Sequence, residues 1–290
     1  MSSPVLKGLA SFAPLTSAEA AVFEAHIEEK GFSKGDRVQA DDALLVVGEG
    51  SIGLSLEGAS GRHVFATVGA GELLGELGLF EPEPIPIVAE AETNGVCYSL
   101  NRRALRVSFQ YARTGGARFM VICASSLSKK LRSANEAVIR SRAQASPGAS
   151  ASDSAAQPSP LGALDRERLK ALSASRSFAA GALIFEEGTP GTELFIIGQG
   201  EVEIVSHATS GEPISVARLG PGDFFGEMAF VDHGPRSASA IARTSVELRA
   251  LPADALERAV ELNVGTALYL TNVICKILAR RLNATLKKML

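Results

Sequence analysis

The sequence has few of the residues that build disulfide frameworks and metal centres. Its three cysteines, Cys97, Cys123 and Cys275, lie far apart and form no CxxC pair, so we expect reduced thiols in a cytoplasmic protein. The four histidines have no ligand spacing to one another or to cysteine, which argues against a metal site. No apolar run approaches the length that crosses a bilayer, and the N-terminal segment lacks the features of a signal peptide. We therefore expect a soluble chain.

The sequence also lacks a large excess of charge of either sign, with 32 acidic and 29 basic residues among 290. No global field would therefore attract nucleic acid or an anionic membrane. Basic residues gather near Lys129 and near Arg280, opposite apolar stripes at helical spacing, and we interpret them as solvated helix faces. No nucleophile or paired acid and base stands out. We expect neither an enzyme nor a bound cofactor.

An internal repeat is the first positive signal. LLVVGEG (Leu44–Gly50) aligns with LFIIGQG (Leu194–Gly200), and GAGELLGELGLF (Gly69–Phe80) aligns with GPGDFFGEMAFV (Gly220–Val231). The offset is 150 residues and then 151. Because the chain is long enough to bury two moderate cores, the repeat predicts two domains of the same fold.

The second copy contains the most informative stretch, FGEMAFVDHGPRSASA, from Phe225 to Ala240. Gly226 lets the backbone approach a ligand closely, and the first helical turn after it offers N–H groups to an anion. Glu227 can accept a hydrogen bond from a ribose hydroxyl. Arg236 supplies a planar, permanently charged fork that matches two phosphate oxygens, and Ser237 adds a hydroxyl beside it. This pattern predicts a pocket for a ribose and a phosphodiester.

The stretch resembles the phosphate-binding cassette of the cyclic nucleotide-binding domain family, which includes the catabolite activator protein and the regulatory subunit of cyclic-AMP-dependent protein kinase. Upstream, Ala179–Val205 is similar to the family's first strands. Downstream, ARRLNATLKKM (Ala279–Met289) resembles the hinge helix of the activator, which implies that Thr285 contacts adenine. The predicted ligand-binding residues are Phe225, Gly226, Glu227, Met228, Ala229, Arg236, Ser237 and Thr285.

The first copy lacks the phosphate fork. Its cassette keeps Gly75 and Glu76, but Ile85 stands opposite Arg236, and Pro86 stands opposite Ser237. Burying a phosphate without a cation costs several kcal/mol. We therefore expect the first copy to be degenerate, with Gly75 and Glu76 retained as a strand-to-helix turn.

The resemblance implies an α+β fold with two tandem antiparallel β-barrel (jelly-roll) domains, each flanked by helices. We expect a degenerate domain over residues 1–143, a flexible linker over 144–160 and the binding domain over 161–290, because the middle segment is rich in Ser, Ala and Pro.

Local patterns predict the elements of the first domain. Residues 17–30 have helical spacing behind a cap at Thr16 or Ser17 with Glu19 after it. From Phe32 to about Leu100, short apolar runs alternate with glycine-rich turns, as in antiparallel strands. Residues 101–140 are again helical. We expect the two long terminal helices to pack against each other, as an intrachain pseudo-dimer, or against a second chain in a homodimer.

The sequence as a whole predicts a cyclic nucleotide sensor with cyclic AMP as the first choice. Cyclic GMP, a cyclic dinucleotide and a ligand-independent scaffold remain open alternatives. The family implies that nucleotide orders the cassette and redirects the following helix. Since the chain ends at Leu290 without a helix-turn-helix and shows no basic pseudosubstrate, we expect the output to be an unidentified protein partner, with no nucleic acid and no membrane.

Overall fold

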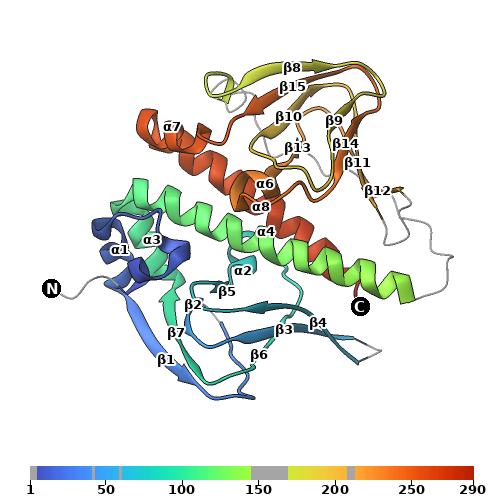
Figure 1. Ribbon diagram of the computed structural model, residues 1–290. Helices are drawn as coiled ribbons and strands as arrows, with labels where there is room; N and C mark the ends of the chain where they lie inside the picture. The colour runs from blue at the N-terminus through green and yellow to red at the C-terminus, as the bar shows by residue number, and fades with distance from the viewer. Residues whose placement is uncertain (1–4, 41–42, 59–60, 145–168, 208–212) are drawn as a thin grey trace. The chain divides into compact units, whose positions relative to one another are not determined.

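The computed structural model describes residues 5–40, 43–58, 61–144, 169–207 and 213–290. The chain forms two compact units, one of Met1–Val138 with Ile274–Leu290 and the other of Ile139–Val273 (Figure 1). The predicted linker over 144–160 lies outside the described residues apart from Gln144. The compact units thus differ from the predicted domains at the C-terminus, where the last helix is divided between them.

The first unit starts with two short 3-10 turns and continues through strands and helices. Its elements are η1 (Leu6–Gly8), η2 (Ala10–Phe12), α1 (Ser17–Glu24), β1 (Ile27–Phe32), β2 (Ala43–Glu49), β3 (Ile52–Gly58), β4 (Gly61–Val68), β5 (Leu73–Leu74), α2 (Leu77–Phe80), β6 (Val88–Ala91), β7 (Gly95–Asn101), α3 (Arg102–Tyr111) and α4 (Arg113–Gln144), of which the last extends past Val138.

The predicted cap of the first helix is confirmed. Thr16 and Glu19 form a reciprocal capping box, in which each side chain accepts from the other residue's backbone N–H. The helix is shorter than the predicted span, because residues from Ile27 onward form β1 and pair with β7 in register from Ile27↔Leu100 to Phe32↔Gly95. This sheet pairing overrides the local helical pattern.

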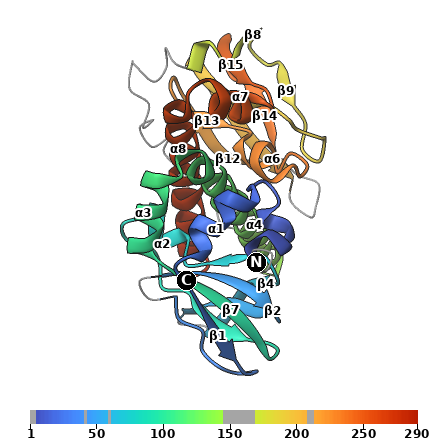
Figure 2. The ribbon, with the colours of Figure 1, turned by 90° about the vertical axis from the view of Figure 1, so that its left-hand side faces the viewer.

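Antiparallel sheets organise the first unit. One sheet has the order β1-β7-β2-β5 and the other has the order β4-β3-β6. β1, β7 and β2 run side by side in both views (Figure 2). Gly50, in the turn between β2 and β3, has φ +88°, a conformation that favours glycine. This turn is one of the glycine-rich turns predicted between the apolar runs, and it is confirmed.

The second unit repeats the strand order and adds one short strand. Its elements are β8 (Ala174–Phe178), β9 (Leu183–Phe185), β10 (Leu194–Gln199), β11 (Val202–His207), β12 (Pro213–Leu219), β13 (Phe224–Phe225), α6 (Glu227–Asp232), β14 (Ser239–Ala242), β15 (Val246–Leu251), α7 (Ala255–Leu262) and the first part of α8 (Val264–Lys287).

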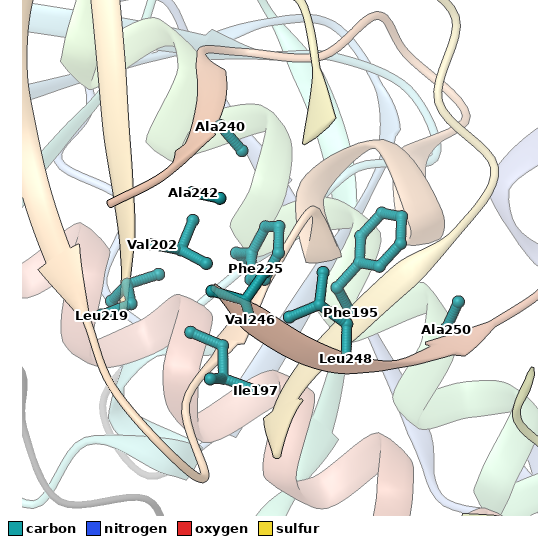
Figure 3. Close-up of a cluster of buried hydrophobic side chains, with 10 residues drawn as sticks. All are labelled: Phe195, Ile197, Val202, Leu219, Phe225, Ala240, Ala242, Val246, Leu248 and Ala250. Atoms are coloured by element: carbon teal, nitrogen blue, oxygen red, sulfur yellow. The ribbon is translucent and has the colours of Figure 1, made fainter. Parts of the chain in front are cut away.

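Two four-stranded sheets, β13-β10-β15-β8 and β12-β11-β14-β9, enclose the core of the second unit. Side chains from both sheets meet in one apolar cluster, with Phe195 and Phe225 at its centre (Figure 3). In the part of the chain that the structure describes, each unit has two separate sheets instead of a closed barrel. The predicted jelly-roll architecture stands in its double-sheet form, and the barrel closure is corrected.

The helix α8 is shared by the two units. Within the first unit its second part contacts α4: the Cys275 thiol lies 3.3 Å from the Met120 carbonyl oxygen, and Thr285 Oγ1 lies 3.2 Å from Asn135 Oδ1. The numbers of both partners rise together, so the helices run in the same direction. The predicted internal pairing of the terminal helices is confirmed for this segment. Among the described residues, no helix is long and apolar enough to cross a membrane.

Candidate functional site

The turn between β13 and α6 requires glycine for two reasons. Gly226 has φ +77°, in the left-handed region. A Cβ at this position would lie 2.5 Å from Arg236 Nη1 and 3.0 Å from the Glu193 carbonyl oxygen. The absence of a side chain therefore lets the start of α6 approach the arginine directly.

The backbone of Arg236 is held by the loop that follows β9. Its N–H donates to the Thr189 carbonyl oxygen at 2.8 Å, and its own carbonyl accepts from Gly188 N at 2.8 Å. The side chain is 5% exposed, and Nη1 donates to the Gly226 carbonyl oxygen at 3.0 Å. The chain thus fixes a buried guanidinium beside the first turn of α6.

Two aromatic rings cover the guanidinium of Arg236. Its Cζ lies 4.2 Å from the ring centroid of Phe185 and 5.7 Å from that of Phe195. Stacking of this kind stabilises a cation electrostatically. A Cβ at Gly191 would overlap Arg236 Nε, so this glycine also makes room for the fork.

The guanidinium nevertheless keeps unused hydrogen-bonding capacity. Arg236 Nε is buried and has no hydrogen-bond partner among the described residues. Burial lowers the pKa of Arg236, and the nearby carboxylates of Glu193 and Glu227 oppose that shift. Since an arginine keeps its proton at neutral pH, a buried cation with an unsatisfied donor lies beside the first turn of α6.

The other predicted residues of the second cassette gather around Arg236 in different ways. Glu227 is buried at the start of α6, and Ser237 Oγ lies 3.3 Å from Met228 Sδ. Phe225 and Ala229 are buried, with the Phe225 ring in the core cluster, so only their backbones are suited to ligand contact.

Thr285 belongs to a different unit from these residues. It belongs to the C-terminal segment of the first unit, where its hydroxyl bonds to Asn135. The structure therefore brings together seven of the eight predicted residues within one unit and assigns Thr285 to the other.

The first cassette has the same turn but different chemistry. Gly75 has φ +94°, and a Cβ there would lie 2.8 Å from the Ala43 carbonyl oxygen, which supports the predicted structural role. Glu76 is buried and forms an ion pair with the buried Lys130 of α4. Lys130 Nζ also donates to the Leu73 carbonyl oxygen at 2.6 Å. The acid that corresponds to Glu227 is thus neutralised within the chain.

Sequence reasoning missed Phe185 and Lys130. Phe185 carries no local signal, because its contact with Arg236 depends on the pairing of β9 with β14. Lys130 was interpreted as part of a solvated face, yet it is 5% exposed. Lys130 is three residues after Leu127 and directly before Leu131, and its burial could have been predicted only if the position of Glu76 were known.

A family model provides the independent comparison. The model described as "Cyclic nucleotide-binding domain" matches residues 32–110 and 175–263, which together are more than half of the chain. The chain belongs to the cyclic nucleotide-binding domain family. Both matches include a cassette, so the internal repeat is a pair of domains of this family.

Individual relatives match shorter parts of the chain. A CRP-like cAMP-activated global transcriptional regulator of Mycobacterium tuberculosis is 35% identical over 108 residues, which cover 37% of this chain and 46% of the relative. A cAMP-dependent protein kinase regulatory subunit of Aspergillus fumigatus is 40% identical over 81 residues, covering 28% of this chain and 19% of the relative. The matched part therefore spans less than half the length of either relative.

A solved structure gives a similar partial match. The crystal structure of the Thermus thermophilus catabolite activator protein is 30% identical and covers 43% of this chain and 57% of that chain, with a TM-score of 0.39. The family assignment rests on the family model and on the two cassettes.

Proposed function

We propose that this protein is a regulatory sensor that binds one cyclic nucleotide, cyclic AMP in the first place, in its second unit. The observation that carries the proposal is the buried Arg236, whose Nε has no hydrogen-bond partner among the described residues. Leaving a buried donor unsatisfied costs about 1–3 kcal/mol. A phosphate would satisfy this donor and supply the opposite charge, which explains why the cost is tolerated.

Each predicted residue has a role in this proposal. Arg236 binds the two exocyclic phosphate oxygens, and the first turn of α6 directs N–H groups from Glu227 to Ala229 toward the same anion. The Glu227 carboxylate accepts from the ribose hydroxyl. Ser237, which is exposed in this structure, adds a hydroxyl at the edge of the pocket.

The experiment that tests the proposal is calorimetric titration of the whole chain with cyclic AMP, cyclic GMP and cyclic di-GMP. We expect one equivalent of cyclic AMP per chain, because the first cassette has Ile85 in place of the arginine and its Glu76 is paired with Lys130. Two equivalents would contradict the single-site proposal. Tighter binding of another nucleotide would identify that nucleotide as the ligand in place of cyclic AMP. If no nucleotide binds, the result would favour the scaffold function.

The base preference is proposed to depend on Thr285. Its hydroxyl donates to Asn135 Oδ1 in the first unit, and its oxygen lone pairs are still able to accept from the adenine amino group. We expect cyclic AMP to bind more tightly than cyclic GMP by about 1–2 kcal/mol, the value of one satisfied polar group. Thr285→Ala should reduce this preference without abolishing phosphate-driven binding. An unchanged preference would show that α8 does not contact the base.

Signalling is proposed to follow from a shift between two conformations, with a protein partner responding to the change. A cytoplasmic location fits the three cysteines, which are all free and buried. The chain then acts by binding and conformational change, as a regulator instead of an enzyme.

A further inference from the structure

The loop of the first cassette has an unusual backbone. Between α2 and β6 it contains the sequence PEPIPI, from Pro82 to Ile87. Its three prolines have no N–H and fix their own φ near −65°, and they force the residues before them into extended conformations. The loop is therefore a stiff extended strip with only three backbone donors, those of Glu83, Ile85 and Ile87.

Asn283 of α8 binds this strip at two points. Its side-chain Oδ1 accepts from Ile85 N at 2.8 Å, and its Nδ2 donates to the Glu83 carbonyl oxygen at 3.1 Å. Asn283 is 5% exposed, and Ile85 is 8% exposed. Because a buried backbone group without a partner costs free energy, this pair of bonds fixes where the helix can sit on the loop. All these residues belong to the first unit.

Further contacts hold the same helical segment on the first unit. Leu282 and Leu286 are fully buried on either side of Asn283. A Cβ at Gly58, at the end of β3, would lie 3.3 Å from Leu290 Cδ2, so the C-terminal residue reaches this sheet. The docked segment therefore extends along the helix to its end.

The two polar features that would receive a nucleotide in this cassette are thus both occupied by the chain itself. Lys130 forms an ion pair with Glu76. Asn283 accepts a hydrogen bond from the backbone N–H of Ile85, the residue that corresponds to Arg236. The helix that supplies Asn283 begins at Val264 in the second unit, immediately after α7.

We infer that the first cassette is an intramolecular receptor for the C-terminal helix, held by Asn283 on the proline-rich strip, and that it responds to the position of α8. The part of this inference that concerns nucleotide rests on the proposed function. Since α8 is continuous between the units, we expect a nucleotide that moves the helix in the second unit to change how much of the helix is docked on the first cassette.

Hydrogen exchange measures the docking directly. A peptide covering the strip contains only three donors, and the Ile85 N–H is the one bonded to Asn283. In the full chain without nucleotide, Asn283→Ala should increase exchange at Ile85 by about ten- to a hundredfold, as expected for loss of one buried hydrogen bond. The exposed Lys287, on the same helix, provides the matched control Lys287→Ala, which should leave exchange unchanged.

A second variant separates docking from general unfolding. Asn283→Asp keeps an acceptor for Ile85 N but cannot donate to the Glu83 carbonyl oxygen. Ile85 should therefore stay better protected than in Asn283→Ala, while exchange in the segment 274–290 increases in both. Equal protection of Ile85 in the parent and in Asn283→Ala would overturn the docking inference. So would equal loss at every amide of the first unit, because that pattern reports unfolding alone.

Titration with cyclic AMP tests the coupling. Linkage requires reciprocity: if cyclic AMP speeds exchange at Ile85, Asn283→Ala must raise cyclic AMP affinity, and if it slows exchange, the variant must lower it. We expect a change of at least about threefold in Asn283→Ala and none in Lys287→Ala. Binding with no change in either quantity would refute the coupling. If cyclic AMP does not bind the parent, the proposed function and the coupling fail, while the exchange test still decides the docking.

Discussion

Replacing Arg236 with leucine tests the proposed nucleotide site at the residue on which the proposal depends most. The side chain is 5% exposed, stacks on Phe185 and has no hydrogen-bond partner for Nε among the described residues. Leucine removes the charge and both phosphate donors but keeps an apolar group against the ring. A bound phosphate would then be buried without a cation.

The expected loss follows from the energy of an uncompensated buried charge. Breaking a buried ion pair by removing one partner costs about 3–5 kcal/mol. This corresponds to roughly two to three and a half decades in Kd. The unliganded protein should lose little stability, because the variant also removes the desolvation that lowers the pKa of Arg236.

Calorimetry with cyclic AMP, combined with thermal unfolding without ligand, separates these effects. Arg243 provides a matched control, since it pairs with Glu203 at 3.3 Å on a half-exposed surface. Arg243→Leu should leave Kd nearly unchanged, because exposed pairs contribute at most about 1 kcal/mol. If Arg236→Leu binds cyclic AMP as tightly as the parent, the cassette does not hold a phosphate. If it binds weakly only because it is unfolded at the assay temperature, the Tm will reveal this.

Three further predictions concern other parts of the chain. Lys130→Met should lower the free energy of unfolding by about 3–5 kcal/mol, because Glu76 is left buried without a cation. Adding Glu76→Gln should restore much of the loss, and melting curves of the double variant without recovery would contradict this pairing. Ile85→Arg should create no second nucleotide site, because Glu76 stays paired with Lys130 and the backbone at position 85 stays bonded to Asn283. Calorimetry should still give one equivalent of nucleotide per chain. Burial raises the pKa of Glu19, but its hydrogen bonds to Thr16 and its ion pair with Arg118 together lower the pKa by more, so the pKa lies below that of a free glutamate. The resulting stabilisation is present above the unfolded pKa and is lost as the pH falls through the folded pKa. Glu19→Gln should therefore flatten the dependence of urea stability on pH over that acid range.

Much of the fold could be predicted because its signals are local or repeated. The capping box at Thr16 depends on residues three apart, and the glycines at the two cassette turns occupy positions where φ is positive. Gly75 and Gly226 are also the residues that align the two repeats. Features of this kind are visible in a sequence because one residue type satisfies the backbone conformation.

The contacts that could not be predicted join segments far apart in the chain. Residues from Ile27 to Lys30 have a helical pattern, but they form a strand because they pair with β7, which lies far along the chain. Asn283 and Ile85 are 198 positions apart, and neither residue has a motif that identifies the other. Side-chain pairing over such separations depends on the packed structure, which local periodicity does not contain.

The two cassettes differ most in how each one uses a buried cation. In the first, Lys130 is paired with Glu76 and bonded to the Leu73 carbonyl oxygen, so its charge is compensated inside the chain. In the second, Arg236 contacts aromatic rings and the Gly226 carbonyl oxygen, and one of its donors stays unsatisfied. A cation whose donors are satisfied stabilises the fold without attracting a ligand, whereas one with an unsatisfied buried donor leaves free energy to be gained from an anion. We propose that the same turn supports an internal docking surface in one unit and a nucleotide site in the other.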